Sequence, residues 1–148
     1  MANYYTYFSL ILRLPDEAAQ AYALEMATQA KRVNQHEETP DKLPESLKET
    51  IENFVFETDA DNSEGEWCIW LHSEYGGIDA ACAFIQHLLR KYDRHGRVAF
   101  EWSNDCSKPR VDAYGGGAAI ITTRKIIGIT TSEWLAKHGL ARAGLKLD

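Results

Sequence analysis

The sequence predicts a single α+β domain in which helices cover one face of an antiparallel sheet. Apolar and polar residues alternate in several short stretches, most clearly in Tyr4–Leu14, and this period of two is typical of strands with one buried face. Between these stretches, Ile78–Tyr92 carries apolar residues at the three- and four-residue spacing of a buried helical face. A length of 148 residues suffices for one core. We therefore expect residues 1–140 to form one domain and residues 141–148 to form a loose C-terminal tail.

Local signals begin and end the first elements. In the first strand, the alternation places Phe8 and Leu12 on one face and Tyr5 and Tyr7 on the other. Pro15 and the two acids after it open a helix, because proline suits the first helical turn and carboxylates stabilise its positive end. We expect this helix to end before a polar loop.

Glycines, acids and a capping motif separate the later elements. The acidic turn Asp59–Gly65 joins two strands into a hairpin, Gly76–Gly77 precedes the clearest helix, and Thr130–Glu133 is a capping box. The expected elements are, in order, the strand Tyr4–Leu14, a helix from Pro15 to about Val33, a short helix from Pro44 to about Asn53, the strands Phe54–Thr58 and Glu66–Ser73, the helix Ile78–Tyr92, the strands Val98–Asn104 and Ala118–Thr123, and a short helix from Thr130 to Gly139. Ile126–Ile129 either prolongs the last strand or forms a short one.

The order of these elements predicts the fold. Two strand–helix–strand units that share one antiparallel sheet are typical of a ferredoxin-like sandwich. We therefore predict a ferredoxin-like sandwich with helices on one face of the sheet and a C-terminal hairpin and helix added to it. A different mixed arrangement of the same elements is the alternative.

The composition is typical of a cytoplasmic protein. Hydrophobic residues make up 45% of the chain and charged residues 26%, which are average values for globular domains. The longest apolar run is far shorter than a membrane span, and no signal peptide begins the chain, so no membrane partner is expected. Cys68, Cys82 and Cys106 lack the spacing of a zinc site or a disulfide framework. Because the histidines are scattered as well, we predict neither a metal nor a cofactor.

Charge is divided unevenly along the chain. Residues 1–74 carry 15 acidic against 5 basic side chains, whereas residues 75–148 carry 7 acidic against 11 basic ones. Much of the acid lies in Glu37–Glu66, which holds 11 carboxylates. An acidic surface repels nucleic acid and attracts a basic partner, so a protein partner is expected and nucleic acid is disfavoured. A solvated surface that merely keeps the protein soluble is the simpler alternative.

The second face of the predicted sheet is a candidate interface. Tyr5, Tyr7 and Trp70 point away from the helices if Phe8 and Ile69 meet them, and aromatic side chains on an open sheet face need a cover. Residues 124–148 or a second copy of the protein could provide it, so a homodimer is one expectation. The aromatic and basic signature of an RNA-recognition sheet is absent. The interface candidates are Tyr5, Tyr7, Trp70, Glu57, Asp59, Asp61 and Glu64.

The stretch between Asp105 and Ala118 is the most specialised of the chain. Its glycines precede a strand-like run, whereas Walker and Rossmann phosphate loops lead into a helix, so neither motif is present. Three glycines before a strand also suit a bulge or a close backbone approach. Cations and glycine amides in one loop nevertheless suit a small anion. The ligand-binding candidates are Cys106, Lys108, Arg110, Tyr114, Gly115, Gly116 and Gly117, and no catalytic residue is assigned.

The segment from Phe100 to Ala118 resembles one found in small uncharacterised proteins of bacterial mobile elements, such as phages and plasmids. The resemblance covers the second half of the chain. It implies an accessory role, such as the inhibition of a host defence system, and it carries no catalytic residue over.

Two functions therefore stay open at the level of the sequence. The first is a small protein-binding accessory module, with inhibition of a bacterial defence system as its specific form. The second is a small-anion or nucleotide-binding protein, which could be an enzyme, with its site in the loop from Cys106 to Gly117. The lack of a recognised catalytic set favours binding over catalysis.

Overall fold

Residues 1–139, which are the residues described by this computed structural model, form a six-stranded antiparallel sheet and four α-helices. The α+β class predicted from the sequence is confirmed. The elements are β1 (Tyr4–Leu14), α1 (Glu17–Asn34), α2 (Glu45–Glu49), β2 (Glu57–Asp61), β3 (Trp67–Ser73), α3 (Ile78–Tyr92), β4 (Val98–Cys106), β5 (Gly115–Ile121), β6 (Ile126–Thr130) and α4 (Thr131–Lys137). Single 3₁₀ turns at Pro40–Lys42 and Ile51–Asn53 flank α2. The predicted C-terminal tail, residues 141–148, lies outside the described residues.

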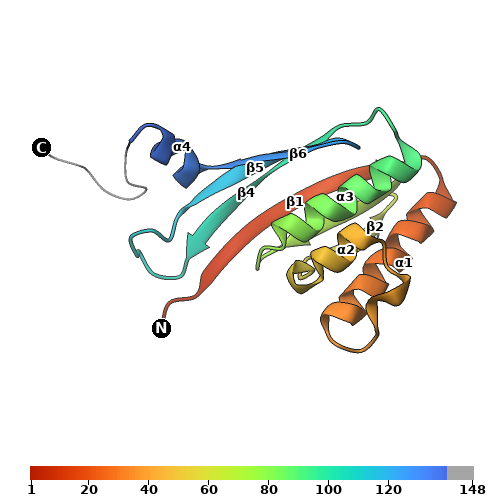
Figure 1. Ribbon diagram of the computed structural model, residues 1–148, viewed down its shortest axis with the longest axis horizontal. Coiled ribbons are helices and arrows are strands. Elements are labelled where there is room, and N and C mark those ends of the chain that lie inside the picture. The colour runs from red at the N-terminus through yellow and green to blue at the C-terminus, as the bar shows by residue number, and fades with distance from the viewer. Residues whose placement is uncertain (140–148) are drawn as a thin grey trace, which may run out of the picture.

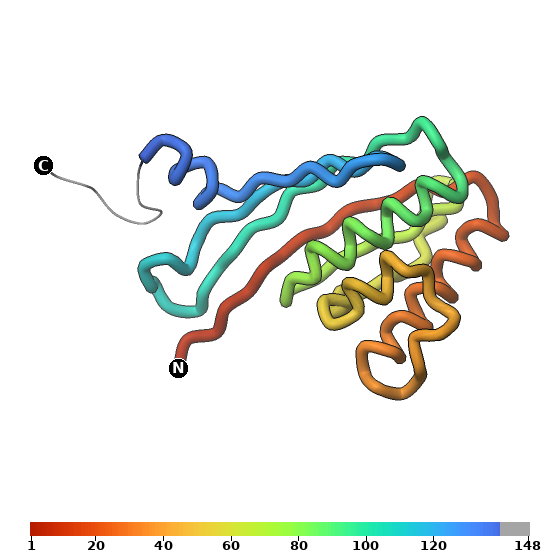
Figure 2. The backbone as a smooth tube through the Cα atoms, in the orientation of Figure 1, coloured from red at the N-terminus to blue at the C-terminus, as the bar shows by residue number. Residues whose placement is uncertain are grey.

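The strands follow the order β2-β3-β1-β4-β5-β6, and every neighbouring pair is antiparallel. Figure 1 shows α1, α2 and α3 on one face of the sheet, while β4, β5 and β6 extend past these helices to α4. We call the face opposite α1, α2 and α3 the outer face. The N-terminus runs beside the loop that joins β4 to β5 (Figure 2), where Asn3 and Ser107 exchange two hydrogen bonds of 2.8 and 2.9 Å. None of the helices within residues 1–139 has the length and hydropathy that a membrane span requires.

The alternation of β1 separates the two faces as predicted. Phe8 and Leu12 are buried against the helices, whereas Tyr7 and Ile11 on the outer face are exposed. The Phe8 ring lies 5.4 Å from the ring of Phe100 on β4. The burial of these side chains removes apolar surface from water and fixes β1 at the centre of the sheet.

The segment before β2 differs from the prediction. The strand was expected at Phe54–Thr58, but the ladder with β3 begins only at Glu57. Phe54 and Phe56 are both buried without pairing to another strand, and their rings surround Phe84 of α3 at 5.9 and 6.0 Å. Two buried residues separated by one partly exposed residue imitate a strand pattern, although here they fill the space under α3.

The structure also settles the strand boundaries in three further segments. Asp59 and Asp61 were expected in a turn, but they belong to β2. The glycines Gly115–Gly117 were expected in the loop, but they open β5 and pair with β4. Ile126–Thr130 forms a separate strand, which resolves the alternative left open by the sequence.

Histidine 87 is half-buried between α3 and α1. Its Nε2 lies 2.7 Å from the hydroxyl of Tyr22 on α1. Burial lowers the pKa of His87, and the charges of Lys91 and Arg90 lower it further. The folded protein therefore holds this imidazole in its neutral form at neutral pH.

The aromatic cluster around Phe84 gives a first prediction. Phe84 is fully buried, so Phe84→Ala should lower the free energy of unfolding by about 3–5 kcal/mol through lost burial and a residual cavity. Ile127→Ala, at a position that is 57% exposed, is the matched control and should change it by less than about 0.5 kcal/mol. Urea unfolding followed by far-ultraviolet circular dichroism measures both. Equal losses in the two variants would contradict the placement of Phe84 in the core.

Histidine 87 gives a second prediction, on pH dependence. Its pKa in the unfolded chain is about 6.5, and the folded state lowers it, so the unfolded state binds the proton more readily. The stability contributed by neutral His87 is present above the unfolded pKa and is lost as the pH falls toward the folded one. The free energy of unfolding of wild type, relative to that of His87→Gln, should therefore be higher at pH 7.5 than at pH 5. Because the pair formed by His72 and Asp59 is present in both proteins, its contribution cancels in this difference. A difference independent of pH contradicts the prediction.

Candidate functional site

The outer face carries most of the exposed large apolar side chains of the sheet. Strand alternation and register place side chains from four strands on this face. They are Tyr7 and Ile11 of β1, Trp70 of β3, Ile120 of β5, and Ile127 and Ile129 of β6. Their exposures lie between 36% and 57%, so the face is open to solvent within the described residues. Apolar surface of this extent on a sheet is typical of an interaction site.

An acidic row adjoins this apolar surface. In the register of β2 with β3, Glu57, Asp59 and Asp61 pair with His72, Trp70 and Cys68, and so share the outer face. Hydrogen bonds from the Ser63 hydroxyl and amide lower the pKa of Asp61 and keep its carboxyl ionised.

The acids of the row differ in what they contact. Glu57 reaches Lys31 of α1 at 2.7 Å, which offsets part of its charge. Glu64 lies in the exposed turn that follows β2. With side-chain exposures of 62% and 59%, Glu57 and Asp59 are both open to solvent, whereas Asp61 is partly buried.

Trp70 is held in place at the centre of this region. Its ring stacks on the imidazole of His72, with 3.7 Å between centroids, and its Nε1 donates a hydrogen bond of 2.8 Å to the Ser9 hydroxyl. The Nε2 atom of His72 in turn lies 2.7 Å from Asp59. An exposed indole fixed in one orientation loses little conformational entropy on binding, which favours it as an interface anchor.

A second aromatic group lies near the start of β1. The rings of Tyr5 and Tyr7 stack with 5.6 Å between centroids, and Tyr75 lies 6.1 Å from Tyr5. Partial burial raises the pKa of Tyr7, and the carboxylates of Glu74 and Asp105 raise it further. Its phenol is therefore a stable hydrogen-bond donor at neutral pH.

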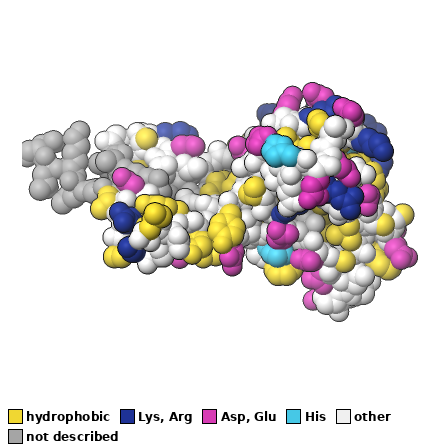
Figure 3. Space-filling view, turned by 90° about the horizontal axis from the view of Figure 1, so that it is seen from below, with side chains coloured by type: hydrophobic (Ala, Val, Ile, Leu, Met, Phe, Trp, Pro, Cys, Tyr) yellow, Lys and Arg dark blue, Asp and Glu magenta, His cyan; other side chains and the backbone are white. Residues whose placement is uncertain are grey.

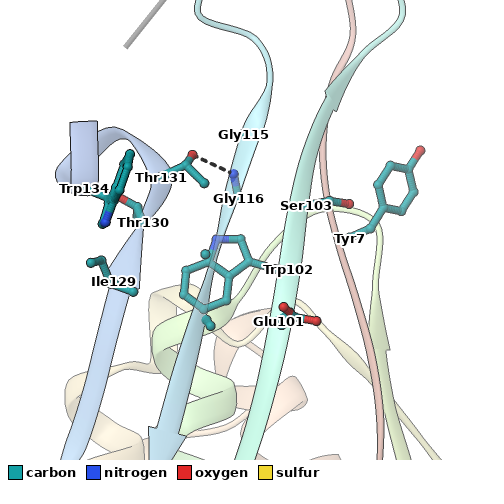
Figure 4. Close-up of a pocket in the computed structure, with 12 residues that line it drawn as sticks. Tyr7, Glu101, Trp102, Ser103, Gly115, Gly116, Ile129, Thr130, Thr131 and Trp134 are labelled. Atoms are coloured by element: carbon teal, nitrogen blue, oxygen red, sulfur yellow. Dashed lines mark hydrogen bonds between the residues drawn. The ribbon is translucent and has the colours of Figure 1, made fainter. Parts of the chain in front are cut away.

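A groove of about 620 Å³ continues from Tyr7 toward α4. Figure 4 shows Tyr7 on one side and Ile129 and Trp134 on the other, with β4 and β5 between them. Glycines line the groove along β5, where the amide of Gly116 donates a hydrogen bond of 3.2 Å to the Thr131 hydroxyl. This bond attaches α4 to β5.

The glycines of β5 are required by close approach rather than by a phosphate loop. A Cβ atom at Gly117 would overlap the indole ring of Trp102 and would lie 2.5 Å from the Ile129 carbonyl oxygen. A Cβ atom at Gly116 would overlap the carbonyl oxygen of Trp102 on the neighbouring strand. This is the structural role that the sequence offered as the alternative to a ligand-binding one.

The other candidates of the predicted anion loop do not converge on one point. Cys106 is buried at the end of β4, with 8% exposure, so its thiol is shielded from a substrate. Lys108 and Arg110 are exposed in the loop outside the groove, while the Tyr114 hydroxyl donates a 3.2 Å hydrogen bond to the Lys108 carbonyl and closes the loop. An anion site in this loop stays a prediction.

The remaining cysteines are buried free thiols as well. Burial raises the pKa of Cys82 to about 11, with a contribution from Asp79. Burial also raises the pKa of Cys68. Within residues 1–139, no group of three or more histidine, cysteine or carboxylate side chains is arranged to hold a metal ion.

The structure also brings together a basic cluster that sequence reasoning missed. Arg90, Arg94, Arg97 and Arg124 line one cavity, which is formed by the turn after α3 and the turn between β5 and β6. The high density of cations in Arg90–Arg97 can be seen in the sequence and could have indicated such a cluster. The approach of Arg124 was not visible, because it depends on the pairing of β4 with β5.

We found no family model, curated protein or solved structure that matches this chain. Function is therefore argued from the geometry of the chain itself.

The close approach at Gly116 gives a third prediction. Gly116→Ala should lower the free energy of unfolding by about 1–3 kcal/mol, because the new Cβ meets backbone that cannot rotate away. Gly128→Ala on β6 is the matched control: its Cβ would lie 3.5 Å from the Ala118 carbonyl oxygen, an ordinary contact. Thermal unfolding of both variants measures the difference. If Gly116→Ala is as stable as Gly128→Ala, the glycines are not required by packing.

Proposed function

We propose that this protein is a protein-binding module whose docking surface is the outer face of the sheet. The observation that carries the proposal is the convergence of exposed apolar side chains from β1, β3, β5 and β6 on one face. Protein interfaces are enriched in such aromatic and aliphatic anchors, with charged residues placed at the rim. Figure 3 shows hydrophobic side chains gathered along the narrower end of the molecule, while charged side chains are interspersed over the broader end.

The chemistry of this face supports a partner that is both apolar and basic. Asp59 and Asp61 stand beside Trp70, so a partner that covers the indole also meets two carboxylates. The net charge of −6 attracts a basic partner over longer distances and increases its rate of association. A nucleic acid would be repelled by the same charges, so a protein fits this face better.

For the architecture, we propose that β1 to β4 with α1 and α3 form a ferredoxin-like sandwich. The support is the order β2-β3-β1-β4 of four antiparallel strands, with one helix after β1 and one after β3. The strands β5 and β6 and the helix α4 are then an addition that widens the sheet. This addition supplies three of the four exposed isoleucines of the outer face, and it forms much of the groove next to α4.

More specific roles remain proposals that the fold neither supports nor opposes. Inhibition of a bacterial defence system is implied by the resemblance to proteins of mobile elements alone. A cytoplasmic location and a homodimer likewise stay predictions of the sequence.

The outer face gives a fourth prediction. Ile11→Asp and Ile127→Asp place an unpaired charge in the proposed interface and should weaken partner capture at least about tenfold, which corresponds to about 1.4 kcal/mol. Ala21→Asp introduces the same charge at an exposed position of α1 and is the matched control. Capture of proteins from a bacterial lysate by tagged wild type and the three variants, quantified by mass spectrometry, measures the effect.

The pattern across these variants decides the outcome. A partner retained by wild type and Ala21→Asp but lost from both isoleucine variants supports the outer face. A partner retained by all proteins binds elsewhere, and equal loss from Ala21→Asp indicates an effect of the added charge that is not specific to the outer face. If wild type retains nothing and elutes as a monomer, the protein-binding proposal fails.

A further inference from the structure

A strongly basic cavity lies at the end of the sheet far from α4. Its volume is about 660 Å³, within the range of small-molecule sites. The lining consists of Arg90, Arg94, His95, Gly96, Arg97, Thr122, Thr123 and Arg124. Figure 1 places the end of α3 and the start of β6 at this end and α4 at the other. Thr131 and Trp134 of α4 line the groove described above. The cavity is therefore separate from the groove next to α4.

Hydrogen bonds between the two turns give the cavity a fixed shape. The Arg90 Nε donates a hydrogen bond of 2.8 Å to the Thr123 carbonyl, and the Thr123 hydroxyl donates one of 3.3 Å to the Arg94 carbonyl. The buried side chain of Gln86 donates 2.9 Å to the Thr122 carbonyl. These bonds fasten the turn between β5 and β6 to the end of α3. A ligand would therefore meet a preorganised site.

The charges in this cavity are not neutralised by the protein. No carboxylate lines the cavity, and within residues 1–139 none of its four arginines forms an ion pair with a carboxylate. Asp93, which precedes Arg94 in the sequence, lies with its carboxylate against Gly96. Four guanidinium groups around one cavity repel one another, so the arrangement is costly without an anion.

The helix dipole accounts for only part of this cluster. Arg90 lies in the last turn of α3, where a cation is favoured by the negative end of the helix. Arg97 lies beyond the C-terminal end of α3, and Arg124 lies in the turn between β5 and β6. The helix dipole therefore explains the position of neither arginine. Both are exposed, and neither guanidinium group donates a hydrogen bond within residues 1–139, although the Arg124 backbone amide donates one to the Thr122 hydroxyl.

We propose that this cavity binds a small molecule carrying two or more phosphate groups. Guanidinium groups match phosphate oxygens in a bidentate geometry, and several of them can share a multiply charged anion. A polynucleotide would extend beyond the cavity onto a protein of net charge −6, which disfavours it relative to a compact anion. This site is independent of the proposed docking surface, since none of its lining residues belongs to the exposed apolar group of the outer face.

The test uses inorganic tripolyphosphate as the probe, in isothermal titration calorimetry on the full chain at about 150 mM salt. We expect saturable binding with one site, and weaker binding of orthophosphate and sulfate. The double variant Arg97→Ala/Arg124→Ala should weaken the binding of tripolyphosphate at least tenfold. The matched control Lys42→Ala/Lys137→Ala removes the same charge from exposed positions outside both the cavity and the loop between β4 and β5, and should leave the affinity unchanged.

Each other outcome overturns the proposal in a distinct way. Equal weakening by both double variants shows that the net charge, rather than the cavity, attracts the anion. Loss of tripolyphosphate binding only in a further double variant, Lys108→Ala/Arg110→Ala, places the site in the loop between β4 and β5. Tighter binding of a 15-nucleotide oligothymidine than of tripolyphosphate, lost in Arg97→Ala/Arg124→Ala, identifies a nucleic-acid site instead. The absence of saturable binding to wild type shows that the cavity takes no phosphate anion. Because capture by the outer face is measured with other variants, failure here leaves the proposed function intact.

Discussion

The central position of β1 is the constraint on which the two surfaces of this protein depend. β1 pairs with β3 along one edge and with β4 along the other, so its alternation determines which side chains are buried on both halves of the sheet. Because side chains alternate along β1, Phe8 and Leu12 pack against the helices, while Tyr7 and Ile11 point to the outer face. A slip of one residue in either ladder would exchange the two sets. The core and the outer face are therefore two consequences of one strand register.

The two edges of the sheet are protected to different degrees. The β2 edge carries Glu57, Asp59 and Asp61 within five residues, and like charges of this kind discourage pairing with a strand of another acidic chain. The β6 edge, Ile126–Thr130, contains neither charge nor proline, and its three isoleucines are exposed. α4 contacts both β5 and β6, and the other edge of β6 pairs with no strand among the described residues. A partner that docks on the outer face can therefore reach an open strand edge at one side of it.

The spacing of apolar residues predicted most helices and strands correctly. It failed where residues are buried in an alternating pattern but do not pair with a neighbouring strand. The alternation of Phe54 and Phe56 is real, but these rings fill space beneath α3 rather than forming a ladder, and no local pattern distinguishes the two cases. The glycines of β5 were read as loop residues because glycine is rare in strands. The close approach of Gly116 and Gly117 to Trp102 on the neighbouring strand β4 explains them. The placement of Tyr7 and Trp70 on the outer face was predictable, since it depends on the period of a single strand. The arginine cavity was not, since it depends on which turns become neighbours.

The uneven charge of the sequence becomes an uneven charge across the sheet. Residues 1–74 supply β1, β2 and β3, and the later residues supply β4, β5 and β6, so the acidic half of the chain occupies one side of the sheet and the more basic half the other. Five strand spacings of about 4.8 Å separate β2 from β6, which gives roughly 24 Å. Since the screening length at physiological salt is about 8 Å, the acids of β2 contribute little to the potential at Arg124. The carboxylates therefore cannot neutralise the arginine cavity from a distance, and the cavity cannot cancel the attraction of the acidic row for a basic partner. One small sheet can in this way carry two surfaces of opposite charge that act independently.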